Sequence, residues 1–354
     1  SGFGRGVIAT NTTGNDNTAV GNRALQDNST GDSNTAVGSG ALDASTTGSE
    51  NTAVGDDALG ANTTASTNTA IGYHAMFTNT TGAGNVAVGG AALLSNATTN
   101  YNTAVGKGAL QANIASNNTA VGYNVLNANT TGAYNTAMGV YALDANTTGA
   151  ENTAVGSFTL TNTTTGTANT GLGYNVLADN TTGAYNTAVG MRSLKSNTTD
   201  YSTAVGYHAL EENTTGASNT AVGANALDDC TTGQLNVAIG RNALTALTTG
   251  EKNVSVGYNA GANFTNSEDN VSIGQQASEA NTTGNRNIAV GTRALDNNTV
   301  SDNVAVGHET LEAVTTGTDN VAIGTRALEA ITTTSYNVAI GHQAMSDGVG
   351  GQEC

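Results

Sequence analysis

Apolar and polar positions along this chain follow a pattern that returns every 17 residues, or every 16 in a few places. With the recurring Asn numbered as position 0, the unit reads N-[T/V]-A-[V/I]-G-x-x-A-L-x-x-N-T-T-G-x-x. The first complete copy begins at Asn17 and the last of the 20 copies begins at Asn337. A fixed short period is typical of a solenoid, in which each repeat is one coil that packs only against its neighbours.

The first five positions of the unit predict a short strand. Position 3 is apolar and position 4 is Gly in all 20 copies. Because alternate residues of a strand face opposite sides, positions 1 and 3 share one face and positions 2 and 4 share the other. We expect the Val/Ile column to lie inside the coil and the small Ala/Gly face to lie against another chain. The pattern therefore predicts lateral association.

The rest of the unit predicts a second strand at about positions 7 to 10 and a turn at Asn-Thr-Thr-Gly. The Gly of that turn is expected to have a positive φ. The chain has no Pro, which suits coils stacked in register, because every residue of a parallel ladder donates its N–H. Helix is not expected, since Thr, Asn and Gly dominate and apolar residues do not recur at a helical period.

The repeat covers the whole chain and predicts one all-β domain. We expect a single parallel β-solenoid over residues 1–354, with about 21 coils of 16 to 17 residues. Residues 1–16 form a degenerate first coil, residues 17–353 hold the twenty repeats, and the coils from about residue 236 are more apolar. Neither end has a polar capping coil, so the chain is expected to be an excerpt of a longer rod or to meet other chains at its ends.

The net charge and the composition of the chain limit the classes of partner that we expect. The net charge is −17 and only 10% of residues are charged. This balance argues against nucleic acid or an anionic membrane as a partner, and no stretch is apolar enough to insert into a membrane. The tightly restricted apolar column argues against disorder.

The Asn-Thr-Thr turns contain sequons for N-glycosylation. Two interpretations stay open: a glycosylated surface, or inward Asn side chains that form an amide ladder, which the apolar replacements Leu247, Phe264, Val314 and Ile331 favour. The candidate glycosylation sites are Asn28, Asn62, Asn79, Asn129, Asn146, Asn180, Asn197, Asn213 and Asn281.

Ten tyrosines occupy two positions that bracket the first strand. They are expected to form two broken stripes, suited to contact with glycans or a partner chain, or else simply to pack over turns. The candidates are Tyr73, Tyr123, Tyr174, Tyr207 and Tyr258 at position 5, and Tyr101, Tyr134 and Tyr185, with Tyr201 and Tyr336, directly before the next Asn.

No catalytic, cofactor or metal site is expected. The four histidines, His74, His208, His308 and His342, lie coils apart, so no pair has metal-ligand or catalytic spacing. Acidic doublets such as Glu211-Glu212 and Asp228-Asp229 are interpreted as isolated surface pairs, and the protein as a non-enzyme.

The two cysteines lie about seven coils apart and are not expected to pair with one another. Cys230 replaces a turn Asn, which predicts a buried thiol. Cys354 is a candidate for an interchain disulfide or a free residue near the end of the chain.

The phrases Asn236-Val237-Ala238-Ile239-Gly240 and Asn337-Val338-Ala339-Ile340-Gly341 resemble the head repeat of YadA-like trimeric autotransporter adhesins. Similar repeats occur in phage tail-fibre-like proteins. The resemblance covers the whole chain, although the unit here is longer and no neck, coiled-coil stalk or anchoring barrel follows. It implies a left-handed parallel β-roll, three chains packed side by side, and adhesion outside the cell.

These observations together predict a non-catalytic, extracellular structural fibre subunit on a cell or virion surface. Its partner is expected to be itself, as a lateral trimer or an end-to-end filament. Alternatives are a glycan-binding adhesin or a phage tail-fibre shaft that uses the tyrosine stripes, and an ice-binding solenoid. We disfavour ice binding at this point, because the Thr at position 1 is expected to share its face with buried Val.

Overall fold

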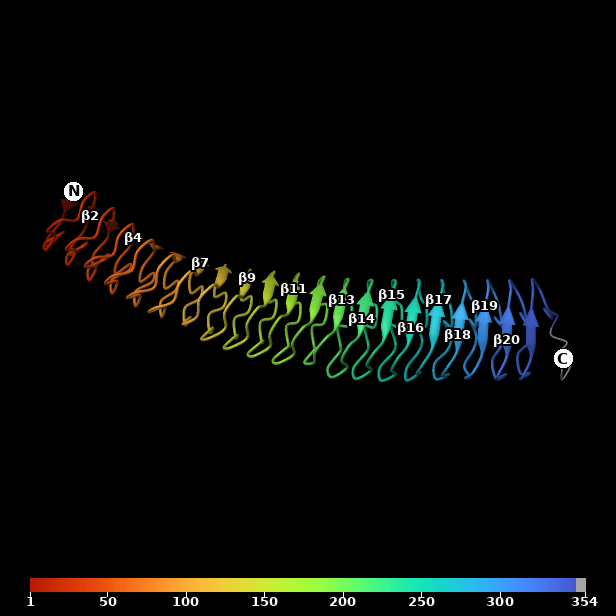
Figure 1. The fold of residues 1–354 in the computed structure, drawn as a ribbon. Coiled ribbons are helices and arrows are strands. Elements are labelled where there is room, and N and C mark those ends of the chain that lie inside the picture. Colours follow the sequence, from red (N-terminus) through yellow and green to blue (C-terminus); the bar gives the residue numbers. More distant parts are fainter. Residues whose placement is uncertain (348–354) are drawn as a thin grey trace. The chain divides into compact units, whose positions relative to one another are not determined.

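The computed structural model describes residues 1–347 and divides into two compact units, Ser1–Thr182 and Gly183–Cys354. In each unit, short parallel strands alternate with turns (Figure 1). The first unit contains β1 (Gly2–Phe3), β2 (Thr18–Val20), β3 (Thr35–Val37), β4 (Thr52–Val54), β5 (Thr69–Ile71), β6 (Val86–Val88), β7 (Thr103–Val105), β8 (Thr119–Val121), β9 (Thr136–Met138), β10 (Thr153–Val155) and β11 (Thr170–Leu172). The second contains β12 (Thr187–Val189), β13 (Thr203–Val205), β14 (Thr220–Val222), β15 (Val237–Ile239), β16 (Val254–Val256), β17 (Val271–Ile273), β18 (Ile288–Val290), β19 (Val304–Val306), β20 (Val321–Ile323) and β21 (Val338–Ile340).

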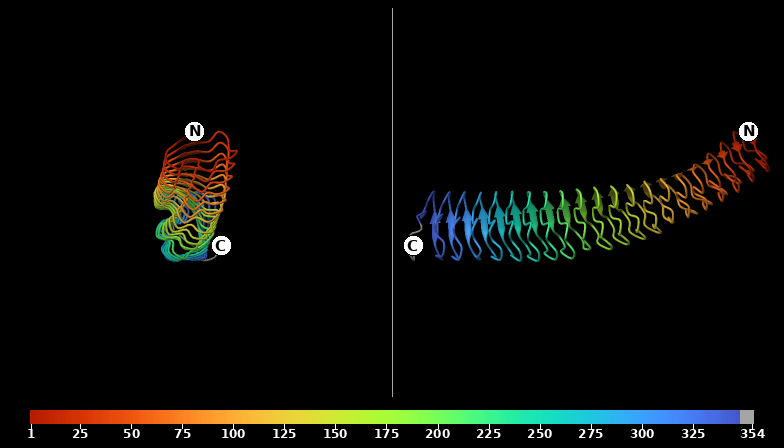
Figure 2. Two further views of the ribbon diagram at one scale, coloured as in Figure 1. Left: turned by 90° about the vertical axis from the view of Figure 1, so that its left-hand side faces the viewer. Right: turned by 180° about the vertical axis from the view of Figure 1, so that it is seen from behind.

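Consecutive strands within each unit pair in parallel, one repeat apart. Thr35 pairs with Thr52 in the first unit, and Val237 pairs with Val254 in the second. Like residues therefore stack on like residues, and the coils of each unit follow one another side by side (Figure 2). The predicted all-β parallel β-solenoid is confirmed. Among residues 1–347 there is no helix, and hence none that is long and apolar enough to span a membrane.

Each described coil has one strand, and the predicted second strand at positions 7 to 10 is wrong. Positions 5 to 10 form a turn in which Asp57, at position 6, and Leu59, at position 8, have φ values of 53° and 52°. Such left-handed residues are incompatible with a strand. The coil-to-coil hydrogen bonds nevertheless continue, from Leu42 N to Ala58 O at 3.1 Å and from Ala44 N to Gly60 O at 3.2 Å.

The core consists of small and medium side chains, and the predicted orientation of the strand is wrong. Ala36 at position 2 and Ala41 and Leu42 at positions 7 and 8 are fully buried, whereas Val37 at position 3 is exposed. The same pattern holds in all strands from β2 to β21: the central residue is buried and its two neighbours are not. The narrow space between the strand and the Ala-Leu turn is filled by the methyl group of the Ala at position 2. The branched side chains of positions 1 and 3 therefore point outward.

The Gly at position 4 is required within the chain itself. Gly38 has a φ of 142°, and a Cβ on it would lie 2.2 Å from the carbonyl oxygen of Gly55 in the next coil. No side chain fits this close approach of two backbones. The invariant Gly therefore does not indicate contact with a partner chain.

The Gly of the Asn-Thr-Thr-Gly turn does not have the positive φ that we predicted. Its role is again close approach, because a Cβ on Gly31 would lie 2.2 Å from the carbonyl oxygen of Gly48. Positive φ values occur instead at positions 6 and 8 and directly before the recurring Asn, as at Glu50, where φ is 59°.

Buried Asn side chains line two columns inside the coils. At position 0, Nδ2 of Asn68 donates to the carbonyl oxygen of Gly82 at 2.8 Å, and its Oδ1 accepts the N–H of Asn85 at 2.9 Å. At position 11, Nδ2 of Asn79 donates to Oδ1 of Asn62 at 3.2 Å and to the carbonyl oxygen of Gly82 at 3.0 Å. These amides satisfy turn carbonyls that would otherwise be buried without partners.

Candidate functional site

The outer face of the sheet carries two parallel columns of side chains. Position 3 supplies Val, Ile, Leu or Met, and none of these side chains is buried in β2 to β21. Twelve of them are exposed by 37% to 70%, Val37 being at the lower limit and Ile340 at the upper. Position 1 supplies Thr in most strands up to β14 and Val or Ile from β15 onward.

This outer face, defined by positions 1 and 3 of β2 to β21, contains no charged residue. The chain as a whole has a net charge of −17, so its charges lie on the turns. Exposed apolar patches on proteins often serve as interaction surfaces, so this face is a candidate for one.

The predicted tyrosine stripes are exposed. All ten tyrosines of the two positions have exposed side chains, from Tyr123 at 42% to Tyr336 at 79%. Tyr185 and Tyr201 stack in adjacent coils, with ring centroids 5.2 Å apart and planes 2° from parallel. Their contact with glycans or a partner remains a prediction.

One group of rings forms a row in the first unit that the sequence analysis did not identify. Tyr123 meets Tyr141 edge-on at 5.4 Å, Tyr141 stacks on Phe158 at 5.7 Å, and Phe158 meets Tyr174 edge-on at 6.1 Å. A side-chain hydrogen bond with Tyr123 raises the pKa of Tyr141. The row was missed because Tyr141 and Phe158 occupy position 6, one residue after the position-5 stripe.

The nine candidate glycosylation sites have fully buried side chains. Asn146, for example, donates from Nδ2 to Oδ1 of Asn129 at 2.7 Å and to the carbonyl oxygen of Gly149 at 3.0 Å. Nδ2 is the atom that would carry a glycan, so the geometry of the folded chain supports the amide ladder. In the more apolar coils, Leu247, Phe264, Val314 and Ile331 take the same interior position.

Cys230 is buried, as predicted, and it is a free thiol in the same interior column. Burial raises the pKa of this thiol to about 12, and its sulfur lies 3.5 Å from the carbonyl oxygen of Gly233. Cys354, the candidate for an interchain disulfide, lies outside the described residues.

The structure brings together a side-chain cluster that the sequence analysis treated as separate residues. His208 and Glu211 lie at positions 6 and 9 of the coil that follows β13, and Asp228 lies at position 9 of the coil that follows β14. Each offers a ligand atom, and these atoms all lie within 4.8 Å of one another. Asp228 lies one repeat of 17 residues after Glu211, so the two occupy the same position in adjacent coils. This spacing would have revealed the cluster.

The Asp228 carboxylate of this cluster is in an environment that disfavours its charged form. Burial, followed by the charges of Glu211, Asp229 and Glu212, raises the pKa of Asp228 to about 6, and Arg192 opposes that shift. Arg192 pairs with Oε1 of Glu211, while Nδ1 of His208 lies 2.9 Å from Oε2. Glu211 and Asp228 therefore share one permanent positive charge, that of Arg192.

A second cluster occupies the equivalent positions further along the chain. Glu309 lies at position 6 and Glu312 at position 9 of one coil, and Glu329 lies at position 9 of the next coil. Two arginines pair with its carboxylates. Arg326 lies 2.7 Å from Glu309, and Arg293 pairs with both Glu309 and Glu312. This cluster is therefore an ion-pair network.

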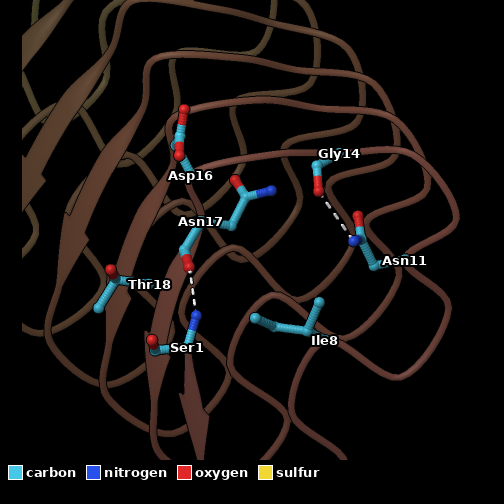
Figure 3. A pocket seen from close by; sticks show the side chains of 7 residues that line it. All are labelled: Ser1, Ile8, Asn11, Gly14, Asp16, Asn17 and Thr18. Atoms are coloured by element: carbon cyan, nitrogen blue, oxygen red, sulfur yellow. Dashed lines mark hydrogen bonds between the residues drawn. The ribbon is translucent and has the colours of Figure 1, made fainter.

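A hollow at the first coil is lined by Ser1, Ile8, Asn11, Gly14, Asp16, Asn17 and Thr18 (Figure 3). Within it, the terminal ammonium of Ser1 donates to the carbonyl oxygen of Asn17 at 2.7 Å, and Nδ2 of Asn11 donates to that of Gly14 at 3.0 Å. These are the contacts of the ordinary coil interior, and the lining offers no nucleophile paired with a base.

Comparison with protein-family models and with curated proteins found no match for this chain.

Proposed function

We propose that this chain is a non-catalytic structural subunit of an extracellular fibre, whose copies pack side by side through the outer face of the sheet. The observation that carries the proposal is the uncharged column of exposed Val and Ile at position 3. Burying such a column removes apolar surface from water. Each Å² that is buried contributes about 25 cal/mol of favourable free energy to association. The resemblance to trimeric adhesin heads agrees with three copies.

A second copy of the same chain is the partner that fits this face best. The column repeats with the spacing of hydrogen-bonded strands, so a partner with the same spacing matches it side chain by side chain. The net charge of −17 opposes association through the turns, which leaves the uncharged face as the contact.

The test is the mass of the purified chain in solution, measured by light scattering or sedimentation. We expect one stable trimer, and dissociation when Val205, Val222 and Ile239 are all changed to Lys. The matched control changes Thr215, Thr232 and Thr249 to Lys, which adds the same charges to the same coils at exposed turn positions. The control is expected to remain trimeric.

Circular dichroism of each variant establishes that the β-structure is retained. A monodisperse monomer of the wild-type chain at high concentration would overturn lateral assembly. A series of sizes that grows with concentration would indicate end-to-end stacking instead.

Ice binding is a second candidate, because the premise on which we disfavoured it is wrong. Thr at position 1 and Val at position 3 share the outward face and neither is buried, as in β3 and β4, and flat arrays of hydroxyl and methyl groups can order water. Thermal hysteresis that disappears when Thr35, Thr52 and Thr69 are changed to Lys would support this function. Its absence in the wild-type chain excludes it.

Glycan binding is the third candidate, and the stacked row of Tyr123, Tyr141, Phe158 and Tyr174 favours it. Exposed aromatic faces pack against sugar rings. On a glycan array, binding by the oligomer should be lost when Tyr123 and Tyr174 are changed to Ala and retained when Tyr336 is changed to Ala. Binding that both variants retain would exclude this row.

A further inference from the structure

We propose that His208, Glu211 and Asp228 form a binding site for a divalent transition-metal ion of the Zn²⁺ class. One imidazole nitrogen and two carboxylate oxygens are ligands that Zn²⁺ accepts, and the imidazole disfavours Mg²⁺ and Ca²⁺, which prefer oxygen alone. The ligand atoms lie within 4.8 Å of one another, so small side-chain movements bring all three to one ion.

Two buried atoms of the cluster, one on Glu211 and one on His208, point to a ligand at this place. The side chain of Glu211 is only 4% exposed and that of His208 only 18%. Oε2 of Glu211 and Nε2 of His208 are both buried and accept or donate no hydrogen bond among the described residues, although Nδ1 of His208 lies near Oε2. Leaving such groups unsatisfied is costly, and coordination to an ion removes the cost for the carboxylate.

The backbone holds the three residues in place before any ion binds. His208 N donates to the carbonyl oxygen of Met191 at 3.1 Å, and Glu212 N donates to that of Asp228 at 3.1 Å. Arg192 pairs with Oε1 of Glu211 and so leaves Oε2 for the ion. The ring of His208 stacks on Tyr207 with centroids 3.8 Å apart, which fixes the ring plane.

The ion would join two adjacent coils, since Asp228 comes from the coil after that of His208 and Glu211. Three protein ligands leave one position of a tetrahedral ion for water. The site lies in turns and not on the outer face of the sheet, so it is independent of how the copies assemble.

The test is titration of the untagged, chelator-treated full chain with Zn²⁺ by calorimetry, and with Co²⁺ by visible absorption. We expect one saturable equivalent per chain. His208→Asn and Asp228→Asn are each expected to weaken binding by at least about tenfold, as losses of metal-site groups do. Amide exchange in the coils after β13 and β14 should slow when Zn²⁺ is added.

Two matched controls separate this site from adventitious binding. His74→Asn removes a histidine whose Nε2 lies 3.5 Å from a carboxylate of Asp57, and Glu309→Gln alters the equivalent cluster, which has no histidine ligand and whose Glu309 pairs with arginine. Both controls should bind Zn²⁺ as the wild type does. Absence of saturable binding, or binding that His208→Asn and Asp228→Asn leave unchanged, would overturn the proposal. If Glu211→Gln fails to fold, these two variants still decide it.

Discussion

Oδ1 of Asn34 accepts the backbone N–H of Asn51, one repeat away, at 3.0 Å. Asn51 in turn offers its own Oδ1 to the N–H of Asn68 at 3.0 Å. Both side chains also donate to a turn carbonyl of their own coil, Asn34 to Gly48 and Asn51 to Ala65, each at 2.8 Å. One amide per coil therefore ties together the start of a strand and the turn that precedes the next strand.

Asn51→Ala should destabilise its neighbourhood strongly. It leaves the N–H of Asn68 and the carbonyl oxygen of Ala65 buried without these partners, at about 1–3 kcal/mol for each group. We expect the free energy of local opening, measured by hydrogen exchange, to fall by a sum of that order in the coils around β4 and β5. Thr52→Ala, at the adjacent outward position, is the control and should change it little. Equal effects of the two variants would contradict the interior role of the amide.

Glu50→Gly should stabilise the protein, although Gly usually destabilises. Glu50 is exposed and has a φ of 59°, a conformation that costs a residue with a Cβ about 1 kcal/mol relative to Gly. Gly84, which occupies the same repeat position with a φ of 68°, is a natural precedent. Thr47→Gly, at an exposed position without a positive φ, should destabilise. Hydrogen exchange of the same coil compares the two variants, and a loss of protection in Glu50→Gly is the contrary outcome.

The thiol of Cys230 should resist alkylation in the folded protein. It is fully buried and its pKa is raised to about 12, so almost none is thiolate at pH 8. Peptide mapping after iodoacetamide treatment should find Cys230 unmodified in the native chain and modified in denaturant. Rapid native labelling would show that the interior column opens readily.

Asp144→Asn should raise stability at pH 7 and leave it nearly unchanged at pH 3. Burial raises the pKa of Asp144 above its ordinary value of 3.8, so as pH rises the unfolded chain loses this proton first. Ionisation therefore favours the unfolded state above about pH 4. Hydrogen exchange of the coil at the two pH values gives the comparison.

Asp302→Asn is the variant of opposite sign. A hydrogen bond from Arg286 lowers the pKa of Asp302, so its contribution to stability is present above the unfolded pKa and is lost as pH falls through the folded value. This substitution should lower stability at pH 7 by a small amount, since both side chains are exposed. The same sign for both aspartates would contradict the assignment.

The repeat period was enough to predict the coils and their parallel pairing, because residues one period apart must stack when every coil is alike. It did not decide which strand face is interior. Alternation groups Ala36 with Gly38 and Thr35 with Val37, but both pairs are restricted in composition. We read the branched residues as core, whereas the coil is so narrow that Ala fills it.

The left-handed leucines and the side-chain cluster were beyond the reasoning that we applied. Leu59 has a φ of 52°, although Leu rarely adopts positive φ, and the coil-to-coil hydrogen bonds together with burial of its side chain stabilise it there. Glu211 and Asp228 were judged by their distance along the chain. In a solenoid the relevant distance is the remainder after whole repeats are subtracted.

The stacking of like on like gives the chain translational symmetry, and this has a consequence for how such a protein changes over time. Recombination between similar repeats can remove or add one whole unit. The two coils at the junction then make the same contacts as before: the Asn hydrogen bonds, the packing of Ala methyl groups and the close backbone approach at Gly. A change of one residue within a strand would instead set Ala against Val in the next coil. The number of coils is thus free to vary in whole steps, while the contents of a coil are held nearly constant.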